Sequence, residues 1–246
     1  MTDASARPIA LVTGASRGIG LAIAKALSHA GYRVARTARN HKDLADTRHQ
    51  LADPDATMAI AADLREANAP ARILAAVAAT LGAPQVVVNN AGTAPSDKIE
   101  NTTDQTLDEV LDLHVKAPFR LVRGALPAMR EMEQASIVQI ASTAGLMGFP
   151  FTAAYTAAKH GMVGLTRALA SELRSTPVRV HAVCAGFVDT DITRRAAAAI
   201  AARGKQTAEE ALRKMSAMNT IGRMHTAEEV AEAVIRLVRE RPEGCI

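Results

Sequence analysis

Residues 9–20 constrain the fold of this chain more than any other part of its 246 residues. The first stretch, IALVT, is apolar and rich in β-branched side chains, which is typical of a short buried strand. The stretch that follows, GASRGIG, is rich in glycine, and a helical pattern continues to about residue 30. A strand that enters a glycine-rich turn and then a helix brings unpaired backbone N–H groups to one point, where they can bind a phosphate group. The beginning of the chain therefore predicts an anion site between a strand and a helix.

The alternation of strand and helix continues along the chain. Further strands are predicted at residues 34–38, 59–63, 85–89, 137–142 and 178–184. Strands that alternate with helices favour a parallel sheet with right-handed crossovers. We therefore predict an α/β protein with a Rossmann-type, doubly wound parallel sheet in a three-layer α/β/α arrangement. Because 48% of the residues are hydrophobic and the composition shows no break, residues 1–246 are expected to form a single domain.

Three polar residues stand out in a strand, a loop and an Ala-rich helix that together span residues 137–173, namely Ser142, Tyr155 and Lys159. Tyr155 and Lys159 are four apart, so a helix places them on one face. An ammonium beside a phenol favours the phenolate, and we expect the pKa of Tyr155 to fall from about 10 towards the range of a general acid or base. A Tyr with a Lys four residues later is also common as a solvated surface pair. The scarcity of tyrosine, with 2 in the chain, and the nearby Ser142 favour the catalytic interpretation.

With this Ser and Tyr-x-x-x-Lys spacing, and with TGASRGIG at residues 13–20, the chain resembles the short-chain dehydrogenase/reductase family, and its 3-oxoacyl thioester reductases in particular. The resemblance covers nearly all of residues 9–240. It implies hydride transfer between a nicotinamide and a carbonyl carbon, while Tyr155 exchanges the proton on oxygen. In the same scheme Ser142 orients that oxygen, and Lys159 lowers the pKa of Tyr155 and binds the nicotinamide ribose.

The resemblance also implies which residues bind the cofactor. The glycine turn would hold the phosphates, the end of the third strand the adenine, the Asn-Asn-Ala-Gly segment a ribose, and the segment after the sixth strand the nicotinamide. The residues are Gly14, Ser16, Arg17, Gly18, Ile19 and Gly20; Asp63 and Leu64; Asn90, Ala91 and Gly92; Gly186, Val188 and Thr190; together with Tyr155 and Lys159.

The residues after the second strand predict which dinucleotide is bound. In dinucleotide folds an acidic residue at this point accepts the ribose hydroxyls of NAD, whereas a basic residue accommodates the 2′-phosphate of NADP. Here Ala38 fills the acidic position and Arg39 follows, and Arg17 could reach the same phosphate. Both arginines could also be ordinary surface residues of an arginine-rich chain. Because no carboxylate would repel the phosphate, we predict NADP.

Two positions depart from the pattern of the family. His114 stands where the family usually has an Asn that holds a water linked to the catalytic Lys. His114 could keep that backbone contact, relay protons with a pKa near neutrality, or weaken turnover, and we count it among the candidate catalytic residues. Ala185 replaces a proline before Gly186 and adds an N–H that needs a partner.

Three further features concern the second half of the chain. Pro118 is expected to kink a helix that spans about residues 103–132. Residues 190–225 are Ala- and Arg-rich and poorly patterned, and the resemblance implies that they form a mobile lid over the substrate. After a helix at residues 227–239 the chain ends at Ile246, where relatives continue with a seventh strand, so we expect that strand to be missing.

Composition disfavours several other functions. The formal net charge is +4 with the positive charges scattered among carboxylates, and aromatic residues make up 2%, so nucleic-acid binding is not expected. The 2 cysteines, Cys184 and Cys245, suit a reducing compartment. The N-terminal residues lack an apolar signal sequence, and no apolar run is long enough for a bilayer. We therefore predict a cytoplasmic protein with no membrane contact and no metal site.

Together these features predict an NADP-dependent oxidoreductase that acts on a small-molecule carbonyl or secondary alcohol. Substrate identity stays open among 3-oxoacyl thioesters, sugars, steroids and cyclic alcohols. The alternative is a non-catalytic NADP-binding sensor or structural subunit, which His114, Ala185 and the missing strand favour and the Ser142, Tyr155 and Lys159 set opposes. A homo-oligomer, tetramer or dimer, is expected through the apolar faces of the two long central helices.

Overall fold

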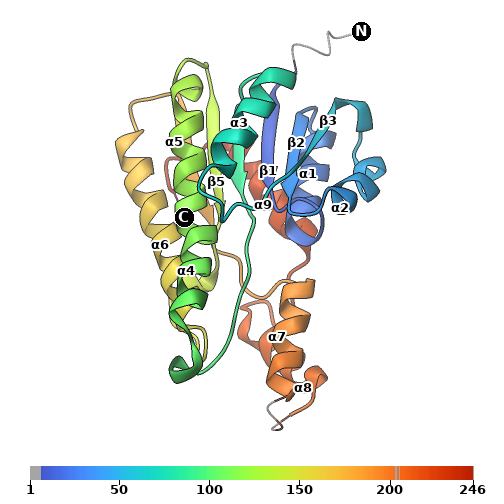
Figure 1. Ribbon diagram of the computed structural model, residues 1–246, viewed down its shortest axis with the longest axis vertical. Helices are drawn as coiled ribbons and strands as arrows, with labels where there is room; N and C mark the ends of the chain where they lie inside the picture. Colours follow the sequence, from blue (N-terminus) through green and yellow to red (C-terminus); the bar gives the residue numbers. More distant parts are fainter. Residues whose placement is uncertain (1–6, 203, 205, 246) are drawn as a thin grey trace.

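The computed structural model describes residues 7–202, 204 and 206–245, and its centre is a parallel sheet (Figure 1). The strands are β1 (Ile9–Thr13), β2 (Arg33–Ala38), β3 (Thr57–Ala61), β4 (Val86–Asn89), β5 (Ala135–Ile140) and β6 (Val178–Val183). Within the described residues they form a 6-stranded sheet in the order β3-β2-β1-β4-β5-β6, and every neighbouring pair is parallel. This order confirms the predicted doubly wound fold, whose ligand site lies where the strand order reverses, between β1 and β4.

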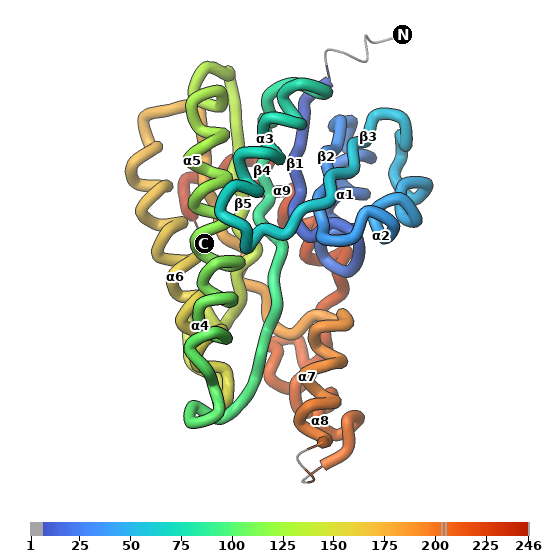
Figure 2. Tube along the Cα trace, in the orientation of Figure 1, coloured from blue at the N-terminus to red at the C-terminus, as the bar shows by residue number. Residues whose placement is uncertain are grey.

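Helices cover both faces of the sheet (Figures 1 and 2). They are α1 (Gly18–His29), α2 (His41–Asp46), α3 (Ala69–Thr80), α4 (Asp104–Leu111), α5 (Ala117–Arg130), α6 (Ala153–Glu172), α7 (Asp191–Ala202), α8 (Ala208–Met218) and α9 (Ala227–Glu240). Leu27 of α1 and Val234 of α9 pack against Val12 on one face of the sheet. Helices α3, α5 and α6 cover the other face, where Leu121 packs with Leu11. Strands that are apolar on both sides are what such a three-layer core requires.

The ends of α3 follow the predicted pattern. Pro70 lies in the first helical turn, where its missing N–H needs no partner, and Gly82 ends the helix with a φ of +109°. The N–H of Gly82 donates to the carbonyl of Val77 at 3.1 Å, which closes the last turn. These local signals made the bounds of this helix predictable to within a residue.

The long helix predicted over residues 103–132 is interrupted, but not by a kink at Pro118. A π-helical turn, Asp112–Lys116, joins α4 to α5, and Pro118 lies in the first turn of α5. Because the helical backbone continues from the π turn into α5, the proline has no N–H to offer the carbonyl four residues earlier, and the wider turn accommodates this loss. The interruption places His114 inside the wider turn, and such turns occur frequently at functional sites.

The segment predicted as a poorly patterned lid contains two helices, α7 and α8, which project from one end of the molecule (Figure 2). A capping box of Thr207 and Glu210 begins α8. The two helices have their own small core, in which Ala197, Ala211 and Met215 are buried. This core is separate from the clusters that line the sheet, so the segment is a packed helical hairpin attached to the main body.

The two ends of the chain bear on two of the predictions made from the sequence. Residues 1–6, in which we predicted no signal sequence, lie outside the described residues, as does Ile246. After α9 the chain returns to β6, where the N–H of Ala182 donates to the carbonyl of Cys245 at 2.8 Å. The absence of a seventh strand stays a prediction. None of the helices in the described residues has both the length and the apolar character needed to cross a membrane.

One side chain in the sheet is costly to bury. Arg36 of β2 is 0% exposed, and its Nη1 donates to the Thr47 hydroxyl at 2.9 Å, while its Nε and Nη2 have no partner among the described residues. Replacing such a group with an apolar side chain of similar length removes the desolvation cost. We expect Arg36→Met to raise the free energy of unfolding by about 1–4 kcal/mol in urea denaturation. Arg236→Met, at an exposed position of α9, is the control. A destabilised Arg36→Met protein would show that the guanidinium is well solvated in the fold.

Candidate active site

A cleft of about 990 Å³ lies at the carboxyl ends of the strands. Most of the candidate site residues line it, from the glycine turn at one end to Tyr155 and Lys159 at the other. They are Gly14, Ser16, Arg17, Gly18, Ile19, Gly20, Arg39, Asp63, Leu64, Asn90, Ala91, Gly92, His114, Tyr155, Lys159 and Thr190. Ser142, Gly186 and Val188 are not among the lining residues. Val188 is buried, so its side chain is not available to a ligand.

The glycine turn has a shape that side chains would prevent. Gly14 and Gly18 have φ values of +65° and +53°, in the left-handed region. A Cβ on Gly20 would lie 2.3 Å from the carbonyl oxygen of Gly14. At the start of α1, Arg17 provides no side-chain cap, and the first turn of the helix holds no acidic residue. Gly18, Ile19 and Gly20 of this turn line the cleft. The turn therefore fits the diphosphate of a dinucleotide.

The end of β4 is tied to this turn by hydrogen bonds. The Asn90 side chain donates to the carbonyls of Thr13 at 2.9 Å and Gly14 at 3.2 Å. In return the Thr13 hydroxyl accepts the N–H groups of Asn90 at 2.9 Å and Ala91 at 3.0 Å. The Asn90 amide nitrogen thus holds the glycine turn in place, and the backbone of Ala91 and Gly92 is what the segment presents to the cleft.

The end of the cleft near β2 and β3 carries opposite charges. Arg65 forms an ion pair with Asp63 at 2.6 Å and a second with Glu109 of α4 at 3.1 Å. The hydrogen bonds from Arg65, and more weakly the charge of Arg39, hold the pKa of the Asp63 carboxyl below its usual value. Arg65 and Glu109 were missed by the sequence analysis, because nothing in the local pattern links residues 44 positions apart. Because the charge of Asp63 is already paired with Arg65, the charge of Arg39 is available to an anionic ligand.

Arg17 is oriented differently from what we expected. Its Nε lies 3.8 Å from a carboxylate oxygen of Asp191, in the first turn of α7, and both side chains are more than half exposed. Gly18 also approaches this region, since a Cβ there would lie 3.6 Å from the methyl group of Thr190. The contact links the glycine turn to the lid across the mouth of the cleft. An exposed pair at this distance is weak and can be exchanged for a phosphate.

Lys159 and Tyr155 meet at the other end of the cleft. The Lys159 ammonium donates to the carbonyl of Ile140 at 2.7 Å, lies 5.7 Å from the centre of the Tyr155 ring, and belongs to a side chain only 4% exposed. Burial lowers the pKa of Lys159 to about 7. Desolvation also raises the pKa of the Tyr155 hydroxyl, although Ser142 partly offsets this effect. The predicted fall in the pKa of Tyr155 is therefore wrong, because burial raises this pKa by more than the hydrogen bond with Ser142 lowers it.

Ser142 sits where the strand β5 turns into the loop before α6. Its hydroxyl accepts the N–H of Ala144 at 3.1 Å and interacts with the hydroxyl of Tyr155. The next residue, Thr143, donates its N–H to the carbonyl of Ala185 at 2.9 Å, which joins this turn to the segment after β6. The serine and tyrosine hydroxyls therefore converge on one point beside the cleft.

His114 is buried behind Tyr155. Its Nε2 lies 2.8 Å from the carbonyl oxygen and 3.1 Å from the amide nitrogen of Thr93, and its ring packs edge-on against the Tyr155 ring with centres 5.6 Å apart. Burial, and then the nearby charge of Lys159, push the pKa of His114 well below its usual value. The ring is neutral at physiological pH, so a proton relay by a near-neutral His114, one of the roles we considered, is not supported.

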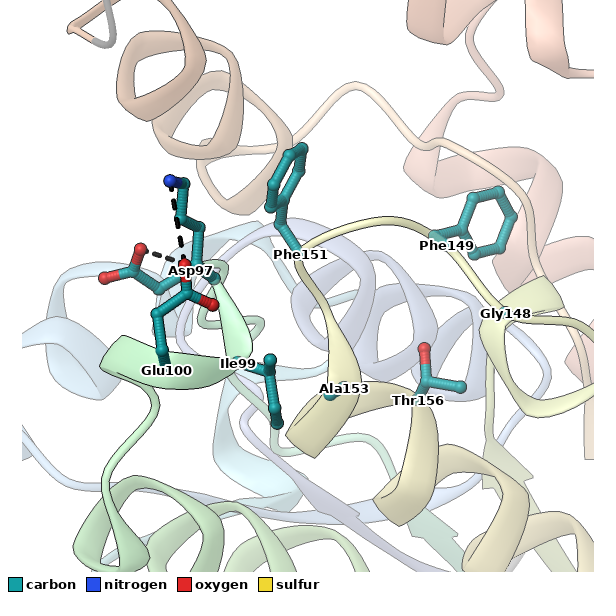
Figure 3. Close-up of a pocket in the computed structure, with 9 residues that line it drawn as sticks. Asp97, Ile99, Glu100, Gly148, Phe149, Phe151, Ala153 and Thr156 are labelled. Atoms are coloured by element: carbon teal, nitrogen blue, oxygen red, sulfur yellow. Dashed lines mark hydrogen bonds and ion pairs between the residues drawn. The ribbon is translucent and has the colours of Figure 1, made fainter.

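A second hollow of about 520 Å³ opens beside the first turn of α6 (Figure 3). Phe149 and Phe151 come from the loop before that helix, and Ile99 and Glu100 from the loop before α4. The two loops are joined by a hydrogen bond from the N–H of Asp97 to the carbonyl of Phe151 at 2.9 Å. The sequence analysis missed this hollow, although the segment GFPF just before Tyr155 is conspicuous in a chain with 4 phenylalanines.

Comparisons with known proteins agree with this geometry. Residues 8–201 match the family described as short chain dehydrogenase. The chain is 38% identical over 234 residues to a putative ketoacyl reductase of the monensin polyketide synthase of Streptomyces virginiae, covering 94% of this chain and 89% of that protein. It is 36% identical over 186 residues to a 3-oxoacyl-(acyl-carrier-protein) reductase of Staphylococcus epidermidis, covering 75% of this chain and 76% of that one. A crystal structure of actinorhodin polyketide ketoreductase with NADPH superposes with a TM-score of 0.90 at 35% identity, covering 95% of this chain and 91% of that chain.

The buried lysine predicts a pH-dependent stability. Lys159 has a pKa of about 7 in the fold, whereas an ordinary lysine side chain has a pKa of 10.5, so between these values the unfolded chain binds an additional proton. Burial of the ammonium therefore destabilises the protein fully below pH 7, and this effect fades as the pH rises towards 10. We expect Lys159→Met to be more stable than the wild type at pH 6.5, and to lose about 1.4 kcal/mol of that advantage per pH unit above 7. Urea denaturation at stepped pH measures it, and parallel curves for the two proteins would contradict it.

The glycine turn predicts a selective loss of binding. In Gly20→Ala the new Cβ collides with the Gly14 carbonyl, so the turn must shift and the affinity for NADPH is expected to fall more than about tenfold. Gly164→Ala, in α6 with nothing within 4 Å of its added Cβ, is the matched control and should bind as the wild type does. Titration of NADPH fluorescence measures both, and equal affinities would show that the turn is not the phosphate site.

Proposed function

Because this chain belongs to the short-chain dehydrogenase family, we propose that it is an NADPH-dependent reductase of the 3-oxo group of acyl thioesters. The observation that carries the proposal is the placement of Tyr155 and Lys159, with Ser142 beside them, at the far end of the cleft that begins at the glycine turn. A dinucleotide bound along this cleft has its reactive end at the three side chains. The ketoacyl reductases among its relatives favour a 3-oxoacyl thioester as the substrate class.

The preference for NADPH rests on charge. Arg39 lines the cleft where a 2′-phosphate would lie, Ala38 leaves that position without a carboxylate, and Asp63 is neutralised by Arg65. The related polyketide ketoreductase was crystallised with NADPH. Arg17, now near Asp191, lies close enough to the cleft to turn towards the same phosphates.

The residues of this chain supply the proton and the geometry, while the nicotinamide supplies the hydride when it is bound. The raised pKa keeps the Tyr155 hydroxyl protonated at neutral pH, so it can donate its proton to the carbonyl oxygen of the substrate. The Ser142 hydroxyl beside it donates a hydrogen bond to the same oxygen and stabilises its developing charge. Lys159, whose pKa of about 7 leaves it partly charged at neutral pH, would bind the ribose hydroxyls, and its charged form would assist the loss of the tyrosine proton.

His114 completes the proposed site as a neutral ring. It fixes the backbone of Thr93 at the edge of the cleft and supports the ring of Tyr155 from behind. Residues 190–225 act as the lid over the substrate, and the chain works as one domain. Of the remaining predicted residues, Thr190 lines the cleft, whereas Gly186 and Val188 would shape the nicotinamide end from behind the lining residues.

We also propose a cytoplasmic homo-oligomer, tetramer or dimer. Leu107 of α4 and Phe119 of α5 are exposed on neighbouring helices, where an apolar face suits a second copy of the chain. Two free thiols, Cys184 and Cys245, suit a reducing compartment.

Reduction of a ketone panel tests the proposed activity. The purified protein is assayed with acetoacetyl thioesters, diketones and cyclic ketones, with NADPH and with NADH. We expect turnover of the thioester with NADPH, and a loss of about 10²–10⁴-fold in kcat in Tyr155→Phe with little change in NADPH affinity. The matched control is Tyr32→Phe, because the chain has 2 tyrosines and Tyr32 packs in the core beside α1.

Two results would contradict the proposal. One is an inert panel with a protein that binds NADPH. The other is a Tyr155→Phe protein that is as active as Tyr32→Phe, since the phenol would then have no part in the proton transfer.

A further inference from the structure

Asn219 lies where the lid returns to the main body, as the residue that ends α8. Its side chain is buried, with the residue 7% exposed. The Oδ1 accepts the N–H of Phe187 at 2.8 Å, and the Nδ2 donates to the carbonyls of Phe187 at 2.8 Å and Arg223 at 2.7 Å. The amide thus pairs with both backbone groups of Phe187 as a neighbouring strand would, and three polar contacts are satisfied by one side chain.

The contact with Asn219 also explains why residue 186 is a glycine. A Cβ on Gly186 would lie 2.3 Å from the Oδ1 of Asn219, closer than any side chain tolerates. We expected Gly186 to allow close approach of a nicotinamide. In the structure the space on its Cβ side is filled by Asn219, so the absence of a side chain at residue 186 is required by the protein itself.

The segment held by Asn219 contacts the neighbour of Ser142 on one side and a wall of the second hollow on the other. The carbonyl of Ala185 accepts the N–H of Thr143, the neighbour of Ser142, at 2.9 Å. The ring of Phe187 meets the ring of Phe149 edge-on, with centres 6.1 Å apart, and Phe149 lines the hollow beside α6 (Figure 3). A shift of residues 185–187 would therefore move the serine turn and one wall of that hollow together.

A second connection holds the same region without Asn219. The N–H of His225 donates to the carbonyl of Phe187 at 2.9 Å, and the N–H of Asp189 donates to the carbonyl of His225 at 2.9 Å. This bridge keeps the lid attached to the body when the amide is removed. It does not fix the N–H of Phe187 or the position of Gly186, which depend on the Oδ1 of Asn219.

We propose that Asn219 is a positioning residue of the reductase, which sets residues 185–187 so that the Ser142 hydroxyl and the Phe187 ring face the substrate carbonyl. The inference rests on the proposed function for what is being positioned. A misplacement of about 1 Å in such a support lowers turnover by as much as about 100-fold, while the distant binding contacts are unaffected. The adenosine end of the cleft, with Arg39 and the glycine turn, does not touch Asn219.

The experiment compares Asn219→Leu, which keeps the size and removes all three hydrogen bonds, with Asn219→Asp, which keeps the acceptor for the Phe187 N–H and loses both donors. Met218→Ala is the control, since Met218 is the preceding residue and 57% exposed. Each protein is assayed for kcat and KM with an acetoacetyl thioester, for affinity towards NADPH and towards 2′,5′-ADP, and for its unfolding midpoint. The second ligand reports on the adenosine end alone.

We expect kcat to fall by about 10- to 100-fold in Asn219→Leu, with a smaller fall in Asn219→Asp and none in Met218→Ala. The KM for the thioester should change less than kcat, and the affinity for 2′,5′-ADP should stay within about twofold, a difference below 0.5 kcal/mol. A purely structural role would instead lower the unfolding midpoint and weaken both ligands together.

Unchanged kcat in a folded Asn219→Leu protein, or a parallel loss of 2′,5′-ADP binding, would overturn the inference. If Asn219→Leu does not fold, the same comparison is made with Asn219→Asp. If the wild type reduces no ketone, the proposed function is wrong, but the role of Asn219 can still be tested without turnover. The test is then the ratio of the affinity for NADPH to the affinity for 2′,5′-ADP. That ratio is expected to fall about fivefold in Asn219→Leu, and an unchanged ratio would overturn the positioning role.

Discussion

The contact between the glycine turn and the end of β4 is the constraint on which the site depends. β1 lies between β2 and β4, so the strand order reverses at β1. The connections on its two sides run in opposite directions along the sheet, and the cleft opens between them. Four hydrogen bonds from Asn90 and Ala91, two of them to the backbone of Thr13 and Gly14, fix the width of this opening. The glycines are needed because the backbone, rather than any side chain, forms both walls. Everything else in the site is arranged along a cleft of this width.

Burial decides the electrostatics of the catalytic end. Tyr155 lies between Lys159 and His114 in the sense that its ring centre is 5.7 Å from the ammonium and 5.6 Å from the centre of the imidazole. Desolvation is the largest cause of the pKa shift in each of the three residues. All three shifts favour the neutral form, so Tyr155 and His114 are neutral at neutral pH and Lys159 is only partly charged. In a site from which water is excluded, the hydrogen bonds to a reacting oxygen are stronger than they would be in bulk water.

The sequence alone was sufficient to predict elements that depend on residues close together in the chain. The strands β1 and β4, the glycine turn and the ends of α3 follow from apolar runs, glycines and a proline, and their predicted bounds agree with the structure. The pKa of Tyr155 was predicted in the wrong direction, because spacing along a helix reveals a neighbouring lysine but not the burial of both groups. The ion pair of Arg65 with Glu109 and the fit of Asn219 against Gly186 join distant parts of the chain. Neither has a signal in one sequence, since each partner is an ordinary residue until the fold brings them together.

The π-helical turn between α4 and α5 has a consequence for insertions and deletions in this chain. A π turn accommodates one more residue than an α-helical turn, and each residue of an α-helix advances about 100° around its axis. Because the wider turn already absorbs the additional residue, deleting a single residue from Asp112–Lys116 would close the segment into ordinary α-helix and leave α4 and α5 in nearly their present relative rotation. The change would be confined to the turn itself, where the ring of His114 would lose its contacts with Thr93 and Tyr155. The additional residue of this one turn thus supports the catalytic tyrosine without altering the outer surface of the helix.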